Sequence, residues 1–225
     1  MTFPGAPEGR ASLVHLKRLL LIGLSHYLYR RGVFNQNTYK RRYIEGGVYM
    51  VIKNSSHNGK LFLRYLSSIG DALSRRRLKK IIVCLYPMRD LKAKPVETFN
   101  FSIRYALPSS AKVIFNVNGE PINTVNYNNS NATRDQVVRL LKNIDQFTKQ
   151  PLGAAAKCHP IIYLELFEND VHSEENEYSP SLFIAAKNGN TILSDTESDI
   201  TCFGCANFQE HAFVLKCFSL LRFRT

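Results

Sequence analysis

Residues 25–43 read Ser-His-Tyr-Leu-Tyr-Arg-Arg-Gly-Val-Phe-Asn-Gln-Asn-Thr-Tyr-Lys-Arg-Arg-Tyr and carry the strongest structural signal in the chain. They begin inside a run of apolar residues at helical spacing, and Gly32 is the residue type that most often ends a helix. The Asn-rich turn that follows is expected to bring Tyr39 and Tyr43 back toward the core on which the helix packs. The stretch therefore predicts a buried helix and its exit turn.

This helix is expected to begin at Ser12, a residue type that caps helices, and to lie in the middle of the domain. Its apolar side chains cover much of its circumference, which is typical of a helix buried on several sides. Residues 1–11 are rich in Pro and Gly and are expected to form a flexible arm. With 225 residues and 44% apolar side chains, the chain can fold as a single domain over residues 12–225.

Two more helices and several strands follow from the spacing of apolar residues. Residues 60–77 and about 131–148 repeat apolar side chains at intervals of three and four, as amphipathic helices do. Strands are predicted at 48–52, 81–86, 99–105 and 161–167, and the unbroken apolar run at 81–86 is typical of a central strand. Residues 106–132 are rich in Asn, Pro, Ser and Gly, which predicts an irregular connection with one weak strand at 113–117.

The C-terminal segment, residues 178–225, follows an acidic loop at 168–177 and is not expected to form a core alone. Short strands are predicted at 181–186, 201–203 and 212–218. We expect them to lie on the sheet that the preceding strands form. This dependence on another surface is the physical basis for a segment that rearranges.

The order of these elements and several short motifs resemble the HORMA-domain family. The opening stretch resembles the start of HORMA domains in its aromatic-Leu-Tyr and Arg-Gly pattern, followed by an apolar pair and Thr-Tyr. The likeness extends from about Ala11 onward. Three motifs resemble the meiotic chromosome-axis branch: Gln150-Pro151-Leu152, Leu164-Glu165-Leu166-Phe167 and Tyr178-Ser179-Pro180-Ser181-Leu182-Phe183. The resemblance implies an α+β fold, with a central, mostly antiparallel sheet packed on three helices, a core at about 12–167 and a C-terminal safety belt at about 168–225.

The resemblance also implies a function. HORMA domains are adaptors, not enzymes, and use no cofactor: each captures a short peptide, the closure motif, which adds as a strand to the sheet edge while the safety belt wraps over it. Main-chain hydrogen bonds then supply affinity, and alternate side-chain pockets supply selectivity. Because the belt must open before the peptide leaves, slow dissociation is expected. In the meiotic branch, capture serves axis assembly, homologue pairing, synapsis and recombination control on nuclear chromosomes. HORMA adaptors of the spindle checkpoint and of DNA repair share the mechanism and are alternatives.

By position, the peptide is expected to pair with residues 161–167, beside the third helix and beneath the belt. The predicted contacts are Val137, Leu141 and Ile144 on the helix, Ile161, Ile162, Tyr163, Leu164, Glu165, Leu166 and Phe167 on the strand, and Phe203 and Phe213 in the belt. The implied partners are closure-motif peptides of other HORMA or axis proteins and a AAA+ remodelling ATPase with its adaptor.

Two features depart from the family pattern. Asn35 stands where many relatives carry Pro, which is expected to alter a turn away from the ligand. Axis members usually continue into a tail with a closure motif of their own, whereas this sequence stops at Thr225. A complete chain of this length would receive a motif without donating one; the alternatives are a domain-length piece or a variant with a replaced end.

The net charge of +12 is concentrated in the first half of the chain. Residues 1–112 contain 21 Lys and Arg against 5 Asp and Glu, whereas residues 113–225 contain 9 against 13. The densest clusters are Lys40, Arg41 and Arg42, and Arg75, Arg76, Arg77, Lys79 and Lys80. Such clusters raise affinity for nucleic acid without reading sequence, so direct DNA or chromatin binding is an alternative function. A solvated basic surface explains the same clusters without a ligand.

Other motifs carry less specific signals. Five cysteines, an odd number at wide spacing, favour reduced thiols in the cytosol or nucleus. Cys202-x-x-Cys205 with His211 is compatible with zinc or a redox pair, but no second ligand pair has finger-like spacing, so packing within a strand is favoured. Cys84 or Cys158 with His159 lacks an elbow turn for nucleophilic catalysis. Aromatic residues between Tyr27 and Tyr49 could stack on bases, although core packing is favoured.

Overall fold

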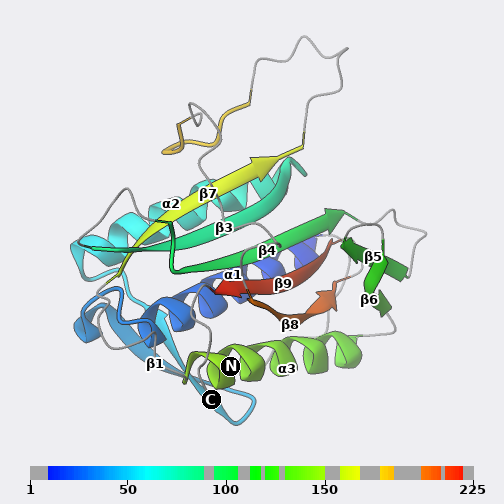
Figure 1. Ribbon diagram of the computed structural model, residues 1–225, viewed down its shortest axis with the longest axis horizontal. Coiled ribbons are helices and arrows are strands. Elements are labelled where there is room, and N and C mark those ends of the chain that lie inside the picture. Colours follow the sequence, from blue (N-terminus) through cyan, green and yellow to red (C-terminus); the bar gives the residue numbers. More distant parts are fainter. Residues whose placement is uncertain are drawn as a thin grey trace.

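The computed structural model describes residues 10–88, 94–105, 112–117, 120–126, 130–149, 158–167, 178–184, 199–208 and 211–219. In these residues, three α-helices cover one face of a five-stranded antiparallel sheet, which confirms the predicted α+β fold (Figure 1). Residues 1–9 of the predicted arm, the acidic loop at 168–177 and the motif at 150–152 lie outside the described residues. Arg10 and Ala11 belong to the first helix, so the expectations that the arm reaches residue 11 and that the helix begins at Ser12 are wrong. No helix among the described residues is long and apolar enough to cross a membrane.

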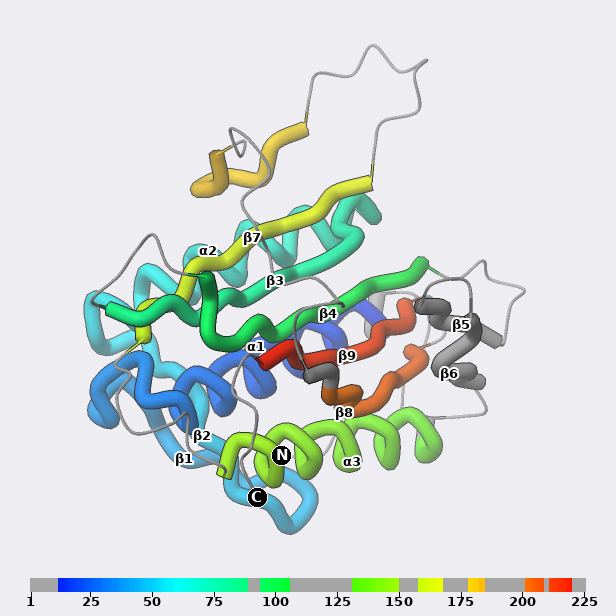
Figure 2. The backbone as a smooth tube through the Cα atoms, in the orientation of Figure 1, coloured from blue at the N-terminus to red at the C-terminus, as the bar shows by residue number. Residues whose placement is uncertain are grey.

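Helix α1 (Arg10–Arg30) lies between the other two helices, as predicted from its broad apolar surface (Figure 2). Its end is closed by hydrogen bonds from Gly32 N to Tyr29 O and from Val33 N to Leu28 O, both 3.0 Å. Gly32 has φ of 65°, a conformation that glycine adopts without strain. The predicted stop is therefore correct.

The exit turn brings back one of the two predicted tyrosines. Tyr39 is 5% exposed and packs edge-on against Tyr29, whereas Tyr43 is 68% exposed, so the expectation that Tyr43 returns to the core is wrong. Both residues belong to strand β1 (Tyr39–Ile44), which forms a hairpin with β2 (Gly47–Ile52). The sequence predicted a short turn that returns both tyrosines to the core. Instead, the chain continues as strand β1, and Tyr43 is exposed on that strand.

The main sheet has the order β7-β3-β4-β9-β8, with β7 (Cys158–Leu166) and β8 (Asp199–Asn207) at its two edges. Strands β3 (Leu78–Pro87), β4 (Glu97–Tyr105) and β9 (His211–Ser219) lie between them. Phe99, Phe101 and Ile103 of β4 face the helices and are buried. The predicted central place of 81–86 and the predicted alternation in 99–105 are both confirmed.

Helices α2 (His57–Ser74) and α3 (Ser130–Thr148) flank α1 on opposite sides (Figure 2). Helix α2 packs near β3, and the Ser56 side chain caps it by accepting a hydrogen bond from Gly59 N at 3.0 Å. Helix α3 packs on β8 and α1. The two amphipathic helices thus pack against opposite halves of the sheet.

The structure differs from two of the predictions made for the connecting segments. Residues predicted to be an irregular connection contain a second hairpin, β5 (Lys112–Val117) with β6 (Glu120–Asn126). Residues 181–184, the described part of the strand predicted at 181–186, lie outside any strand. The terminal strands predicted at 201–203 and 212–218 are confirmed within β8 and β9, which form an antiparallel hairpin.

Candidate peptide-binding site

The candidate site is the outer edge of β7, which pairs with β3 on one side and with no other described strand. Phe167 N donates to Arg77 O at 2.8 Å, so residue 167 directs its main chain toward the β3 side. Main-chain groups of alternate residues point to opposite sides of a strand, and the irregularity in this ladder adds its extra residue to β3, not β7. Ile162, Leu164 and Leu166 therefore direct their N–H and C=O groups to the open edge.

The position of Pro160 is consistent with even-numbered residues of β7 directing their main-chain groups to the open edge. It has the same parity as Ile162 and Leu164, and proline has no N–H to offer a neighbouring strand. Prolines in sheets are confined to such outward-facing positions on edge strands. Beyond Pro160 the outward donors and acceptors pair with no strand in the described residues, and such an edge is one to which an extended peptide can add.

Apolar side chains line both faces of this edge, and all of them are half-buried. Ile162, Leu164 and Leu166 contact the core on the helix side. Ile161 and Tyr163 pack on the opposite face against Ile82, Cys84 and Tyr86. A strand added here would therefore find apolar contacts for side chains on both of its faces.

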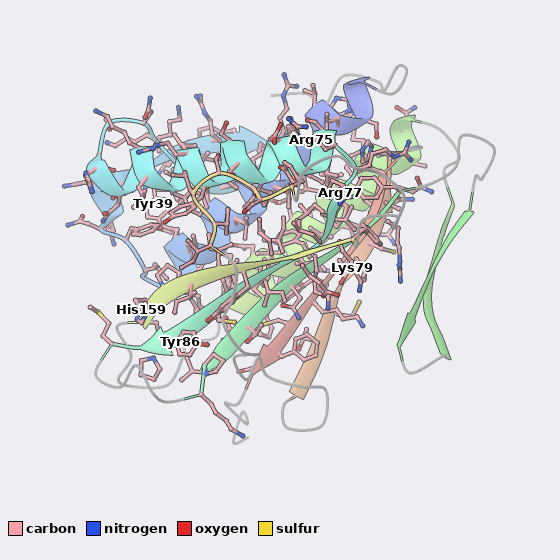
Figure 3. The ribbon with its side chains drawn as sticks, turned by 90° about the horizontal axis from the view of Figure 1, so that it is seen from above. Tyr39, Arg75, Arg77, Lys79, Tyr86 and His159 are labelled. Carbon is pink, nitrogen blue, oxygen red and sulfur yellow. The ribbon has the colours of Figure 1, made fainter. Side chains whose placement is uncertain are left out.

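The two ends of β7 differ in chemistry. Tyr86 and His159 stack at one end, with ring centroids 5.9 Å apart, and Arg77 and Lys79 lie at the other (Figure 3). At the basic end, Lys79 Nζ and Lys80 Nζ lie 2.5 and 2.8 Å from the two oxygens of Glu165. Partial burial opposes ionisation of Glu165, but the two lysines prevail and hold its pKa below the usual value.

Residues 178–184 are attached to α2 beyond this edge (Figures 1 and 3). Tyr178 Oη donates to Asp71 at 2.8 Å, and the Arg75 guanidinium lies 5.1 Å from the centre of the Tyr178 ring. The Ser68 hydroxyl donates to Ser181 O, and Phe183 meets Tyr65 edge-on at 5.5 Å. Burial, followed by the hydrogen bond to Asp71, raises the pKa of Tyr178 to about 12, so its hydroxyl stays a donor at neutral pH.

The β8–β9 hairpin lies at the other edge of the sheet, where β9 pairs with β4 along its full length. The ends of its two strands, at Asn207 and His211, are held by hydrogen bonds from two helices. Ser12 Oγ of α1 shares a 2.8 Å hydrogen bond with His211 Nδ1. On α3, Thr133 Oγ1 donates to Asn207 O at 2.8 Å, and Gln136 Oε1 accepts from Asn207 N at 2.9 Å. The C-terminal hairpin is thus held away from β7.

The HORMA-domain family model matches residues 12–209 of this chain. The chain belongs to the HORMA-domain family. HORMA domain-containing protein 1 of Danio rerio is 30% identical over 187 residues, which are 83% of this chain and 51% of that protein. The chain therefore spans about half the length of this relative.

Solved HORMA structures share the fold. C. elegans HTP-1 bound to HTP-3 motif-1 has a TM-score of 0.77 at 18% identity, covering 94% of this chain and 91% of that one. C. elegans HTP-2 bound to the HIM-3 closure motif has a TM-score of 0.75 at 17% identity, with coverage of 94% and 91%. These likenesses show that the chain has the same fold as these two structures.

The predicted peptide contacts do not all come together in this HORMA domain. The predicted β7 residues line the open edge. Val137, Leu141 and Ile144 are at most 1% exposed and lie in the core under the opposite half of the sheet, so the expectation that α3 flanks the β7 edge is wrong. The helix beside β7 is α2 (Figure 1). The prediction failed because apolar spacing shows which face of a helix is buried, but not which strand that face packs against.

The two belt phenylalanines also lie elsewhere. Phe203 of β8 and Phe213 of β9 are at most 2% exposed and pack with Phe99 and Phe101 of β4. They fasten the hairpin to the core at the far edge. Among the described residues of the C-terminal segment, Tyr178 and Phe183 lie toward the β7 side, and their signal in the sequence was the Tyr-Ser-Pro-Ser-Leu-Phe motif.

The basic clusters have different surroundings. Arg75 pairs with Asp71 at 3.1 Å, Arg76 lies 5.4 Å from the Tyr105 ring centre, and Lys79 and Lys80 hold Glu165. Lys40, Arg41 and Arg42 are exposed on β1, and none has an ion-pair partner within the described part of the chain. The structure thus separates a cluster that interacts with neighbouring side chains near the β7 edge from a cluster that is directed to solvent on β1.

The environments of the described cysteines do not favour a reactive thiolate or a metal site. Cys202 is exposed and Cys205 is half-buried on β8, and burial raises the pKa of Cys205 to about 11, which keeps it protonated. Cys84 is buried, and burial likewise raises its pKa to about 11. The described residues contain no cluster of three or more His, Cys, Asp or Glu side chains suited to a metal ion.

Proposed function

We propose that this protein captures a closure-motif peptide as an added strand on the open edge of β7, beneath its C-terminal segment. The observation that carries the proposal is the division of the C-terminal segment between the two edges of the sheet. Its hairpin is paired with β4, while β7 keeps its outward main-chain groups unpaired among the described strands. That division leaves a template for a peptide strand next to the belt that would cover it.

The contacts around β7 support strand addition in particular. Ile162, Leu164 and Leu166 present outward donors and acceptors, and apolar side chains border them on both faces of the sheet. Main-chain pairing gives affinity that tolerates many sequences, and the side-chain positions on each face set which peptides fit. Residues 178–184, held on α2, would close the site from outside.

This arrangement predicts slow exchange of the peptide. A strand enclosed between β7 and the belt leaves only after the C-terminal segment loosens from α2 or from β4. Affinity differences would therefore be expressed mainly in the dissociation rate. A AAA+ remodelling ATPase with its adaptor is the class of partner that would supply energy for opening. The proposed work is binding, and no catalytic step is assigned.

The biological setting we propose is the meiotic chromosome axis, with the protein in the nucleus on chromosomes. The support is the likeness to HORMA domain-containing protein 1 and to C. elegans HTP-1 and HTP-2 bound to closure motifs. Capture of partner axis proteins would then serve axis assembly, homologue pairing, synapsis and recombination control. A role in the spindle checkpoint or in DNA repair uses the same edge, and the peptide sequence that binds distinguishes these roles.

The test is fluorescence polarization with labelled closure-motif peptides from axis, checkpoint and repair proteins, with incubation long enough for slow binding. The informative variant is Leu164→Pro, which removes one outward N–H and places a proline ring against the incoming strand. We expect at least about tenfold weaker binding, since one ladder hydrogen bond is removed and a steric clash is added. Pro160 indicates that an outward position of this strand tolerates proline.

Leu164→Ala is the matched control, because it loses the same core packing but keeps the N–H. It should retain most of the affinity that Leu164→Pro loses. Urea unfolding of both variants separates a blocked edge from a destabilised fold. If no closure-motif peptide binds the wild-type protein, or if Leu164→Pro and Leu164→Ala bind alike, strand addition at β7 is wrong.

A further inference from the structure

A second surface, on the far side of the molecule from β7, combines exposed positive charge with a groove. Strand β1 carries Lys40, Arg41 and Arg42 in succession, all exposed and without an ion-pair partner in the described ranges. The cross-strand partner of Arg42 is Tyr49 of β2. Tyr49 lines a groove between the hairpin and the C-terminal half of α3.

The groove has a volume of about 210 Å³ and places further cations next to the hairpin. It is lined by Val48 and Tyr49 of β2 and by Lys142, Asp145, Gln146 and Lys149 at the C-terminal end of α3. Lys142 and Lys149 are both exposed and are seven residues apart, which places them on one side of the helix. Cations on two separate elements therefore border one depression.

The nearby acidic groups are already neutralised. Glu45, in the β1–β2 turn, pairs with Arg134 of α3. Asp145 is held by His26 at 2.9 Å, by Lys149 at 3.1 Å and by Arg30. Partial burial opposes ionisation of Asp145, but these partners prevail and lower its pKa to about 2, so it is a carboxylate with its charge fully engaged. The field around the hairpin is therefore set by its uncompensated lysines and arginines.

We propose that the β1–β2 hairpin and the C-terminal half of α3 form a binding surface for the sugar-phosphate backbone of DNA. Because neighbouring residues of a strand point to opposite faces, Lys40 and Arg42 share the face of Tyr49 and the groove, with Lys142 and Lys149 across it. These cations suit phosphates spaced along a nucleic-acid strand. Tyr43, which is 68% exposed, lies on the other face of β1 together with Arg41, and it favours DNA over an acidic peptide, because an aromatic ring beside a cation can stack on a base. The hairpin lies at the opposite end of the molecule from β7, so peptide and DNA can bind together (Figure 1).

The test compares two triple variants that change the net charge equally. One is Lys40→Gln/Arg41→Gln/Arg42→Gln on the hairpin. The other is Arg18→Gln/Lys60→Gln/Arg64→Gln, which removes three exposed cations from α1 and α2. Binding to a fluorescent single-stranded oligonucleotide and to its duplex is measured as a function of salt. At about 0.1 M salt the hairpin variant should bind at least about tenfold more weakly than the matched variant.

The slope of log affinity against log salt should also become shallower by about one for each phosphate that the variant no longer neutralises. Lys142→Gln/Lys149→Gln should produce a further loss of affinity, and thermal melting checks that every variant is folded. The proposal is overturned if the wild-type protein does not bind DNA, or if the two triple variants weaken binding equally. It is also overturned if polyglutamate of equal charge competes as well as the unlabelled oligonucleotide.

Discussion

At the scale of single residues, the buried pair Arg31 and Glu97 joins the end of α1 to the sheet. Arg31 Nη2 lies 2.7 Å from Glu97 Oε2, Tyr27 Oη donates to Glu97 Oε1 at 2.6 Å, and both charged side chains are at most 2% exposed. The geometry compensates charges that are costly to bury. This network lies at the C-terminal end of α1, within the stretch 25–43 that gave the strongest structural signal in the sequence.

We expect Glu97→Gln to lower the free energy of unfolding by about 3–5 kcal/mol, because the Arg31 guanidinium loses its buried carboxylate partner. Tyr27→Phe removes one hydrogen bond to the same carboxylate and keeps the ion pair, so it should cost about 1–2 kcal/mol. Urea unfolding monitored by circular dichroism measures both. Equal losses in the two variants would contradict a dominant role for the ion pair.

His211 makes the attachment of the C-terminal hairpin sensitive to acid. Burial, followed by the positive charge of Arg76, lowers the pKa of His211 to about 4. The unfolded chain takes up a proton near pH 6.5, whereas the folded chain does so near pH 4. The stability that His211 contributes is therefore fully present above about pH 6.5 and is lost as pH falls toward 4.

Between about pH 7 and pH 4 this single group should reduce the free energy of unfolding by up to about 3 kcal/mol. His211→Asn, which keeps an acceptor for Ser12, should remove that part of the pH dependence. The measurement is the difference between wild-type and variant unfolding free energies at each pH. His57→Asn on an exposed turn of α2 is the control, and a wild-type-like profile for His211→Asn would refute the assignment.

At the scale of elements, the segment 178–184 is the part of the belt whose attachment can be tested directly. Tyr178→Phe removes the hydrogen bond to Asp71, and Phe183→Ala removes the ring that meets Tyr65. Each change weakens the closure of the proposed site and leaves β7 intact. We expect peptide dissociation to accelerate by roughly two- to tenfold for Tyr178→Phe and more for Phe183→Ala.

Competition with unlabelled peptide after complex formation gives these dissociation rates. Ile184→Ala is the matched control, because Ile184 is 95% exposed and its truncation removes apolar area without disturbing the packing on α2. Its rate should equal that of the wild-type protein. Unchanged dissociation for Phe183→Ala would show that this segment does not restrain the peptide.

The elements predicted best from the sequence are those whose apolar pattern is intrinsic to them. Strand β4 alternates because one of its faces packs on the helices, and α1 is apolar on several sides because it lies between α2 and α3. Strand β1 has Lys40, Arg41 and Arg42 in its middle and exposes them. It is a strand through its pairing with β2, which no local pattern reveals.

At the scale of the whole molecule, the β7 edge, where we propose that the peptide binds, shows the same limit of sequence-based prediction. The prediction of β7 as a strand is correct, since its residues have their own apolar pattern. The expectation that α3 stands beside it is wrong, because helix position depends on the order of strands in the sheet. Leu141→Asp, which would be a test of peptide contact if α3 faced β7, should instead unfold the protein, as Leu141 is 1% exposed.

The last prediction concerns movement between the two edges of the sheet. Ser102 of β4 and Val214 of β9 are cross-strand partners on the face away from the helices. A disulfide formed by Ser102→Cys/Val214→Cys would lock the hairpin to β4, provided that Cys205→Ser removes the free thiol opposite residue 214 on β8. If the hairpin must leave β4 before a peptide enters or departs, the oxidised protein should exchange peptide at least about tenfold more slowly in both directions.

The equilibrium affinity should then change little, because the locked arrangement is the one proposed to hold the peptide. The same protein after reduction is its own control and should exchange at the wild-type rate. Stopped-flow and competition measurements supply the association and dissociation rates. Rapid exchange in the oxidised protein would mean that the peptide reaches β7 while the hairpin stays in place, and that opening is confined to the contacts of residues 178–184 with α2.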